Sequence, residues 1–296
     1  MKKKNIASSL WVVLLVLLAA IFARQEPLSQ IFGSSKKPKR ELAEQSEASI
    51  PQSRLEVSLP QSETSDRLIE LPASLKGMPE QIIKHEGYTL SFNKDHCNPN
   101  WVAWELTAQE TEGTLSRYKT FLPDPLLPEE LQVTSDEYRD SGYDRGHMCP
   151  AADMKWSKEA MKACFYMSNM CPQVPQLNSG GWQKLEAACR RWAVQEGRVY
   201  IICGPMYNNQ RKRKTIGKKF EITIPTGFFK CVLSLNPGRE KAIGFYYANK
   251  DHKQSIGQTV RSVDEIEELT GMNFFVFLED KLEKRLEASC SLKEWQ

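Results

Sequence analysis

The chain carries SGYDRGHMCPAADM at residues 141–154 and SNMCPQVPQLNSGGWQKLE at residues 168–186. In the first stretch His147 follows Arg145 and a glycine, which lets side chains approach a ligand closely. Neutral imidazole is well suited to take a proton from water near neutral pH. In the second stretch Asn178 offers an amide oxygen, which suits Mg²⁺ because this ion takes few protein ligands and keeps its waters. The two stretches therefore predict a site with a base, a metal ligand and a cation.

The second stretch leads into a predicted helix over 182–196. Its apolar residues recur at helical spacing and Gly197 stands at the expected end; they are Trp182, Leu185, Cys189 and Trp192. Glu186 and Arg190 then share one edge of this helix, beside the buried stripe. Such an i,i+4 pair is ordinarily a surface ion pair of small energetic value. Because Asn178 lies just upstream, we interpret the pair as part of the site.

The rest of the chain predicts an α+β domain. Strands are expected at 89–92, 101–107, 199–203, 228–235 and 243–248, and helices at 157–170, 262–271 and around Leu278, Leu282 and Leu286. Strands and helices do not alternate strictly, which disfavours a doubly wound parallel sheet. The expected architecture is a mixed, largely antiparallel central sheet flanked by helices.

Several motifs together resemble a known family. They are WVAWEL at 101–106, LSRYKTFLPDP at 115–125, DRGH at 144–147, the SN-x-x-PQ…LN…W-x-x-LE run at 168–186, and VDEIEELTG at 263–271. The chain resembles the DNA/RNA non-specific endonucleases of the ββα-metal (His-Me finger) group, which includes secreted bacterial nucleases and mitochondrial endonuclease G. The resemblance spans roughly residues 88–278 and implies a ββα-metal active site within the α+β fold.

The resemblance implies a role for each residue at the predicted metal centre. His147 would be the general base and Asn178 the direct ligand of Mg²⁺, for which Mn²⁺ would substitute. Glu186 would bind metal-coordinated waters rather than the ion itself. Asp144 would be a structural residue of the DRGH motif rather than a catalyst.

The resemblance also implies roles for three arginines, whose planar charged forks suit phosphate oxygens. Arg117 would bind and neutralise the phosphate, Arg145 would position the scissile group, and Arg190 would stabilise the charged transition state. Asn169 matches a family asparagine that orients the histidine or the active-site network.

The predicted function is that of an exported, Mg²⁺-dependent, sequence-non-specific endonuclease. It would hydrolyse phosphodiester bonds of DNA, RNA or both and leave 5′-phosphate ends. The sequence leaves a homodimer open. An alternative is a catalytically silent nucleic-acid-binding or uptake protein on the same fold. Another is a zinc-stabilised module using His147, Cys149 and Cys171, although H-x-C lacks the usual knuckle spacing and would consume the base.

The net charge of +3 over 296 residues excludes a global polycation, so affinity for nucleic acid must come from local groups. One candidate is the basic run at 211–214 together with Lys218 and Lys219. The run is compatible with a loop that attracts nucleic acid and equally with a solvated hairpin.

The N-terminal segment has the order of an export signal. Three lysines at 2–4 precede an apolar stretch at 10–23, which predicts a signal peptide or an N-terminal membrane anchor over residues 1–24. Residues 25–74 are expected to be a disordered polar linker, and residues 75–296 the endonuclease domain. The expected location is therefore periplasmic, cell-surface or secreted in a bacterium, with a membrane tether as the alternative to cleavage.

Export changes how the eight cysteines are interpreted. An oxidising compartment favours disulfides, and eight cysteines allow 105 connectivities that sequence alone cannot separate. Cys149 and Cys171 stand at equivalent steps in HMCP and NMCP, so the sequence hypothesis is a disulfide between them that clamps the metal finger.

Overall fold

The computed structural model describes residues 68–207, 213–251 and 253–296. The predicted signal peptide or anchor, the linker up to residue 67 and the first two residues of the basic run lie outside this part. Ile69 is buried against the domain, and the backbone N–H of Ala73 donates to the carbonyl of Asn273 at 2.9 Å. Among the described residues, no helix combines the length and apolarity that crossing a bilayer requires.

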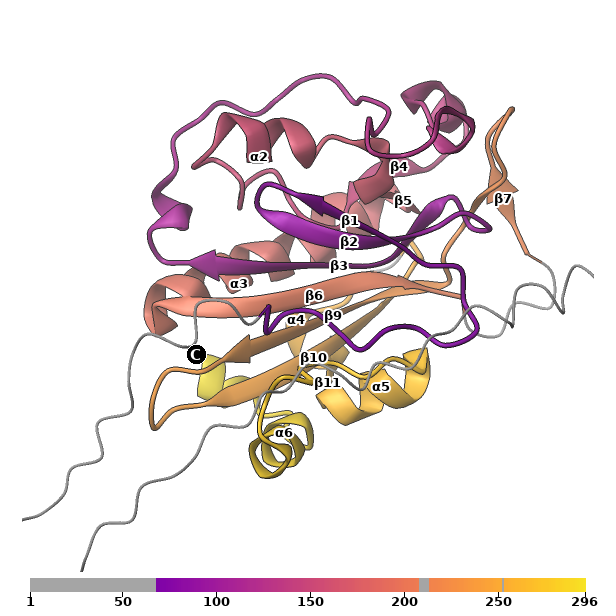
Figure 1. Cartoon of the computed structure of the whole chain (residues 1–296). Coiled ribbons are helices and arrows are strands. Elements are labelled where there is room, and N and C mark those ends of the chain that lie inside the picture. Colours follow the sequence, from indigo (N-terminus) through magenta and orange to yellow (C-terminus); the bar gives the residue numbers. More distant parts are fainter. Residues whose placement is uncertain (1–67, 208–212, 252) are drawn as a thin grey trace, which may run out of the picture. The chain divides into compact units, whose positions relative to one another are not determined.

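A seven-stranded antiparallel sheet forms the centre of the domain (Figure 1). Its strands, in spatial order, are β1 Gln81–His85, β2 Tyr88–Asn93, β3 Asn98–Thr107, β6 Arg198–Met206, β9 Gly227–Ser234, β10 Lys241–Ala248 and β11 Val260–Arg261. Two short hairpins stand apart from it: β4 Asp144–His147 with β5 Met170–Gln173, and β7 Thr215–Ile216 with β8 Ile222–Thr223. The predicted α+β class with a largely antiparallel sheet is confirmed.

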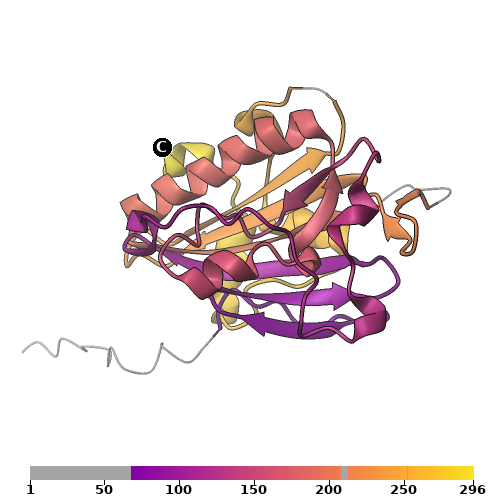
Figure 2. The same ribbon diagram turned by 90° about the horizontal axis from the view of Figure 1, so that it is seen from above.

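Helices occupy both faces of the sheet. They are α2 Lys158–Ala163, the π-helical turn η5 Leu177–Trp182 that continues into α3 Gln183–Glu196, α4 Ile256–Thr259, α5 Val263–Thr270 and α6 Asp280–Glu287. Short 3₁₀ turns are η1 Glu110–Glu112, η2 Glu129–Leu131, η3 Ser135–Tyr138, η4 Met167–Asn169 and η6 Leu292–Trp295. Figure 2 shows α3 as a long helix running along the sheet.

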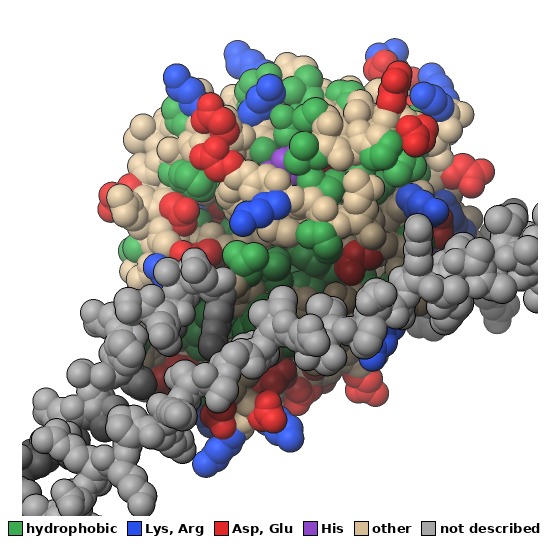
Figure 3. All heavy atoms as spheres, viewed as in Figure 1, with side chains coloured by type: hydrophobic (Ala, Val, Ile, Leu, Met, Phe, Trp, Pro, Cys, Tyr) green, Lys and Arg blue, Asp and Glu red, His purple; other side chains and the backbone are tan. Residues whose placement is uncertain are grey.

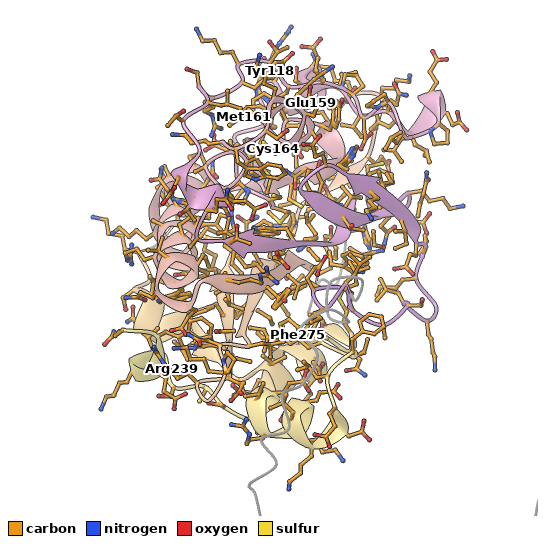
Figure 4. The ribbon with its side chains drawn as sticks, turned by 60° about the vertical axis from the view of Figure 1, so that its left-hand side comes forward. Tyr118, Glu159, Met161, Cys164, Arg239 and Phe275 are labelled. Carbon is orange, nitrogen blue, oxygen red and sulfur yellow. The ribbon has the colours of Figure 1, made fainter. Side chains whose placement is uncertain are left out.

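Alternation along the strands sends side chains into two separate cores. In β3, Val102 and Trp104 join the core beneath α2, α3 and the β4–β5 hairpin, whereas Trp101 and Ala103 join the core beneath α5 and α6. Figure 4 labels Cys164 and Phe275, which belong to these two cores and lie on opposite sides of the sheet.

Capping residues explain where helix α5 begins and ends and where helix α3 ends. Ser262 and Glu265 form a reciprocal capping box at the start of α5, and Gly271 ends it with a φ of +71°. Gly197 ends α3 with a φ of +79°. Trp182 and Trp192 are buried, as their helical spacing predicted.

The helix predicted over 157–170 is only partly formed. Ser157 caps α2 as expected, but α2 ends at Ala163 and the turn η4 follows. The chain then enters β5, because Met170 and its neighbours pair with the DRGH strand β4. Local helical spacing was overridden by a long-range strand pairing.

The predicted disulfide between Cys149 and Cys171 is wrong, because all eight cysteines are free thiols. The strand register explains the error. Cys171 pairs with Gly146, three residues before Cys149, so the two cysteines are not at equivalent steps of the hairpin. Both thiols are instead buried among apolar side chains of the core.

We expect Gly146→Ala to destabilise the fold by about 1–3 kcal/mol through overpacking. A Cβ at this position would lie 2.7 Å from the Cβ of Gln173 on the facing strand. Urea unfolding would measure the change. Gly257→Ala is the matched control, since a Cβ there meets nothing within 4 Å and alanine favours helix. Equal stabilities of the two variants would contradict the prediction.

Candidate active site

The β4–β5 hairpin, the π-helical turn η5 and helix α3 surround a cavity of about 450 Å³. Its lining includes six of the seven predicted site residues and Asp144. The full lining is Arg117, Phe121, Asp144, Arg145, His147, Pro150, Ala151, Ala152, Asn178, Ser179, Gln183, Glu186 and Arg190. Residues from positions 117 to 190 thus meet at one site, on the α3 side of the sheet.

Trp182 joins the hairpin to helix α3. Its indole Nε1 donates to the carbonyl oxygen of His147 at 3.3 Å, and its ring contacts Phe228 and Tyr247 of the sheet. The preceding residue, Gly181, must be a glycine because the backbone passes close to the Tyr247 ring. A Cβ on Gly181 would lie 2.7 Å from that ring.

Two phenylalanines hold the cationic side chains and the imidazole. The Arg145 guanidinium lies 4.9 Å from the centre of the Phe121 ring, and the Arg117 guanidinium lies 4.9 Å from that of Phe165. The imidazole of His147 contacts both rings, at centroid distances of 5.6 Å and 4.9 Å. The aromatic pair therefore orients the base and two arginines together.

His147 is electrically neutral at physiological pH. Burial, and secondarily the positive charge of Arg117, lower the pKa of its imidazole to about 3. Its Nε2 atom is buried and has no hydrogen-bond partner among the described residues. The imidazole is thus in the form that can accept a proton.

Asn178 is oriented by the DRGH strand. Its Nδ2 donates to Oδ2 of Asp144 at 2.9 Å. Because this bond engages the amide nitrogen, the amide oxygen remains available as a ligand. Asn178 stands near the start of a π-helical turn, a local irregularity that often occurs at functional sites.

Glu186 supplies a second carboxylate to the cavity, besides that of Asp144, which is hydrogen-bonded to Asn178. Burial raises its pKa to about 7, although the positive charges of Lys230, Arg190 and Arg117 act in the opposite direction. A neutral amide oxygen and one carboxylate, beside arginines, suit Mg²⁺ bound largely through water. The residues present therefore fit the predicted ion.

Arg190 is held by a partner that sequence reasoning did not identify. Its guanidinium donates to Oδ1 of the buried Asp153 at 2.8 Å, and Trp104 Nε1 donates to the other carboxylate oxygen at 3.2 Å. The pair fixes the guanidinium at the cavity edge. The sequence indicated this acidic residue only by its position, because Asp153 lies in the AADM segment that follows His147.

Lys230 is a second residue that the sequence did not single out. It lies on β9 with no solvent exposure, and its ammonium lies 4.8 Å and 4.6 Å from the ring centres of Trp104 and Trp182. Burial opposes its charge, but neighbouring thiols and the carboxylates of Glu186 and Asp153 raise its pKa. It places a positive charge near the carboxylates of Glu186 and Asp153.

Asn169 does not line the cavity. It is fully buried, and its side chain accepts from the N–H of Cys149 and donates to the carbonyls of Cys149 and Cys164. These bonds hold the backbone that follows His147. The alternative zinc set is not gathered, because His147, Cys149 and Cys171 do not bring their ligand atoms within 4.8 Å of one another.

The fold and the cavity define the ββα-metal class: a hairpin bearing a histidine, packed on a helix that begins beside the amide of Asn178. The profile of the DNA/RNA non-specific endonucleases matches residues 72–281. The chain belongs to this family.

Named relatives agree with this assignment. A nuclease of Nostoc sp. is 34% identical over 220 residues, which are 70% of this chain and 77% of that protein. Human mitochondrial endonuclease G is 30% identical over 212 residues, covering 67% and 71% of the two chains. Nuclease 1 of Schizosaccharomyces pombe is 39% identical over 170 residues, and the chain spans only 52% of its length.

A solved structure shares the fold. It is the crystal structure of the EndoG/EndoGI complex, described as showing the mechanism of EndoG inhibition. The match has a TM-score of 0.64 at 28% identity and covers 70% of this chain and 91% of that chain.

The predicted location, bacterial export to the periplasm, surface or medium, is wrong by these comparisons. Nuclease 1 of S. pombe, the S. cerevisiae nuclease and human endonuclease G are all mitochondrial proteins. A basic and apolar N-terminus does not by itself specify the compartment, because organelle transit peptides also combine cations with apolar residues. The expectation of disulfides rested on the same argument.

We expect Asp144→Ala to weaken Mg²⁺ binding about 10–100-fold, because the Asn178 amide loses the partner that orients it. Isothermal titration calorimetry of the purified chain would measure the affinity. Asp136→Ala is the matched control, because it removes an equal charge from an exposed ion pair with Arg139. An unchanged Kd in Asp144→Ala would contradict the proposed orientation.

Mg²⁺ affinity should decrease as the pH is lowered, because protonation removes the negative charge of Glu186. With a pKa of about 7 the carboxyl is mostly protonated at pH 6 and mostly ionised at pH 8, so the apparent affinity should be roughly tenfold lower at pH 6 than at pH 8. Calorimetry in buffers of different ionisation enthalpy would count the released proton. Glu186→Gln should bind more weakly and show no such pH dependence; equal wild-type affinities at both pH values would refute the assignment.

Proposed function

We propose that the protein is a Mg²⁺-dependent, sequence-non-specific endonuclease that hydrolyses phosphodiester bonds of DNA, RNA or both. The observation that carries the proposal is the convergence of a neutral buried imidazole, an oriented amide oxygen and three arginines on one cavity. Family membership and relatives that are named nucleases support it.

His147 acts as the general base and takes a proton from the water that attacks phosphorus. General bases typically contribute 10²–10⁴-fold to the rate. The imidazole is prepared for this role because burial and Arg117 keep it neutral. A substrate phosphodiester beside Arg117 would offset that positive charge and make the imidazole more basic.

The arginines bind the phosphodiester and stabilise the charge that develops on it. Arg117 is exposed at the rim and neutralises the phosphate, whereas Arg145 stands beside His147 on β4 and positions the scissile group. Arg190, fixed by Asp153, stabilises the transition state.

Asn178 would hold Mg²⁺ directly and Glu186 would hold its waters; Mn²⁺ would substitute. When bound, the ion supplies positive charge to phosphate oxygens as a Lewis acid. The cleavage products would carry 5′ phosphates.

Recognition by phosphate contacts explains the absence of sequence preference. In the face shown in Figure 3, Lys and Arg side chains are interspersed with Asp and Glu side chains and do not form a broad basic field. We assign substrate binding to the arginines that line the cavity. A homodimer and a membrane tether stay predictions from the sequence.

The deciding experiment incubates the purified chain with supercoiled plasmid and with RNA, with Mg²⁺, Mn²⁺ or EDTA. Wild type should cleave at least one of the two polymers with metal, and His147→Ala should lose about 10²–10⁴-fold in rate on it. His96→Ala is the matched control, since that histidine pairs with Thr223 outside the cavity. Product ends should accept a kinase-transferred phosphate only after phosphatase treatment.

The enzyme proposal would be overturned if DNA and RNA both stayed intact with Mg²⁺ and also with Mn²⁺. Binding of the plasmid without cleavage would instead indicate the catalytically silent binder.

A further inference from the structure

Three carboxylates meet on the face of the sheet opposite the catalytic cavity. Asp264 and Glu267 come from α5, and Glu287 comes from the last turn of α6. Their ligand oxygens all lie within 4.8 Å of one another. Val263, Ile266 and Leu286, beside them on the same helices, belong to the core of this face and not to the core beneath the cavity. In Figure 3 acidic side chains are visible low in the view, where α5 and α6 lie in Figure 1.

Glu287 distinguishes this group from an ordinary acidic surface. The residue is 4% exposed, and its Oε1 is buried without a hydrogen-bond partner among the described residues. Within the described ranges, none of the three carboxylates forms an ion pair with a lysine, arginine or histidine. A buried carboxylate that faces two others and no cation lacks a counter-charge.

The two other carboxylates are positioned to share a ligand. Oε1 of Glu267 accepts the backbone N–H of Phe274 at 2.6 Å, which fixes that side chain against the chain that leads to α6. Asp264 is exposed, so the group is open to solvent on one side. Glu283, one turn before Glu287 on α6, adds a fourth negative charge nearby.

Burial and repulsion between the neighbouring carboxylates raise the pKa values of Glu287 and Glu267. Burial, followed by the charges of Glu267, Glu283 and Asp264, raises the pKa of Glu287 to about 8. Burial and the neighbouring carboxylates likewise raise the pKa of Glu267 to about 6, against a backbone hydrogen bond that lowers it. A cation bound between the three carboxylates would relieve this repulsion.

We propose that Asp264, Glu267 and Glu287 form a divalent-cation site that joins α5 to α6, with Ca²⁺ as the preferred ion. Oxygen-only donors exclude the softer ions that prefer imidazole or thiolate. The carboxylate oxygens lie within 4.8 Å of one another, close enough for one ion to bind all three. Ca²⁺ suits ligands contributed by two separate helices, because it accepts six to eight oxygens at about 2.3–2.6 Å in a flexible geometry, whereas Mg²⁺ demands a near-ideal octahedron. Water entering past Asp264 would complete the six to eight ligands. The site is structural, because it is separated from the catalytic cavity by the sheet.

The test uses the full chain with Asn178→Ala, which removes the proposed catalytic metal ligand, after EDTA treatment and dialysis. Calorimetric titration with CaCl₂ at pH 8 should show one binding event. Glu287→Gln in the same background should abolish it or weaken it at least tenfold. Glu268→Gln, which removes an exposed carboxylate from α5 outside the group, is the matched control and should bind as its parent does.

Stability provides a second readout. A hundredfold excess of Ca²⁺ over its Kd should raise the Tm of the parent by roughly 5–10 °C. Glu287→Gln should show no such rise. Without Ca²⁺ the parent should lose stability as pH increases from 5 to 8, since the raised pKa means that the folded state binds more protons than the unfolded chain. Ca²⁺ should therefore stabilise more at pH 8 than at pH 5.

Asp264→Asn is the variant to use if Glu287→Gln does not fold, because position 264 is exposed and tolerates the change. Both variants should retain wild-type plasmid cleavage with Mg²⁺ when Asn178 is present, so failure of this proposal is separable from failure of the nuclease proposal. Absence of Ca²⁺ binding at pH 8, or undiminished binding in either variant, would overturn the site. Stronger binding of Mg²⁺ than of Ca²⁺ would overturn the ion preference.

Discussion

The indole of Trp182 packs against Phe228 and Tyr247 of the sheet while its N–H donates to the carbonyl of His147. This one side chain anchors α3 on the sheet and ties it to the hairpin that carries the histidine. The hairpin β4–β5 has only four residues in each strand, too few to hold itself in place. The positions of Asn178, Glu186 and Arg190 relative to His147 all depend on this anchor.

A layered arrangement of charge surrounds the anchor. Arg190 is paired with the buried Asp153, and behind both the ammonium of Lys230 lies between the rings of Trp104 and Trp182. Buried charges are costly unless they are compensated; the aromatic rings and the carboxylates of Glu186 and Asp153 offset the cost of burying the Lys230 ammonium. The result is a cavity whose cationic groups are fixed before a substrate arrives, which is what stabilisation of a developing negative charge requires.

Local sequence patterns predicted much of this arrangement. The apolar spacing from Trp182 to Trp192 identified α3, and capping at Ser262 identified α5, because both depend on residues within a few positions of each other. The patterns failed where distant segments compete. Met170 reads as the end of a helix, yet it pairs with His147 in a strand, and Cys171 faces Gly146 rather than Cys149.

Short, fixed spacings in the sequence were enough to predict the components of the site: the DRGH strand, Asn178 before a helix, and Glu186 and Arg190 on one edge of that helix. How these residues are supported depends on tertiary contacts. The Asp144–Asn178 hydrogen bond, the Asp153–Arg190 pair, the buried Lys230 and the carboxylates shared by α5 and α6 each join residues 20 or more positions apart. Such pairs depend on strand register and on how helices pack, and no local periodicity encodes either.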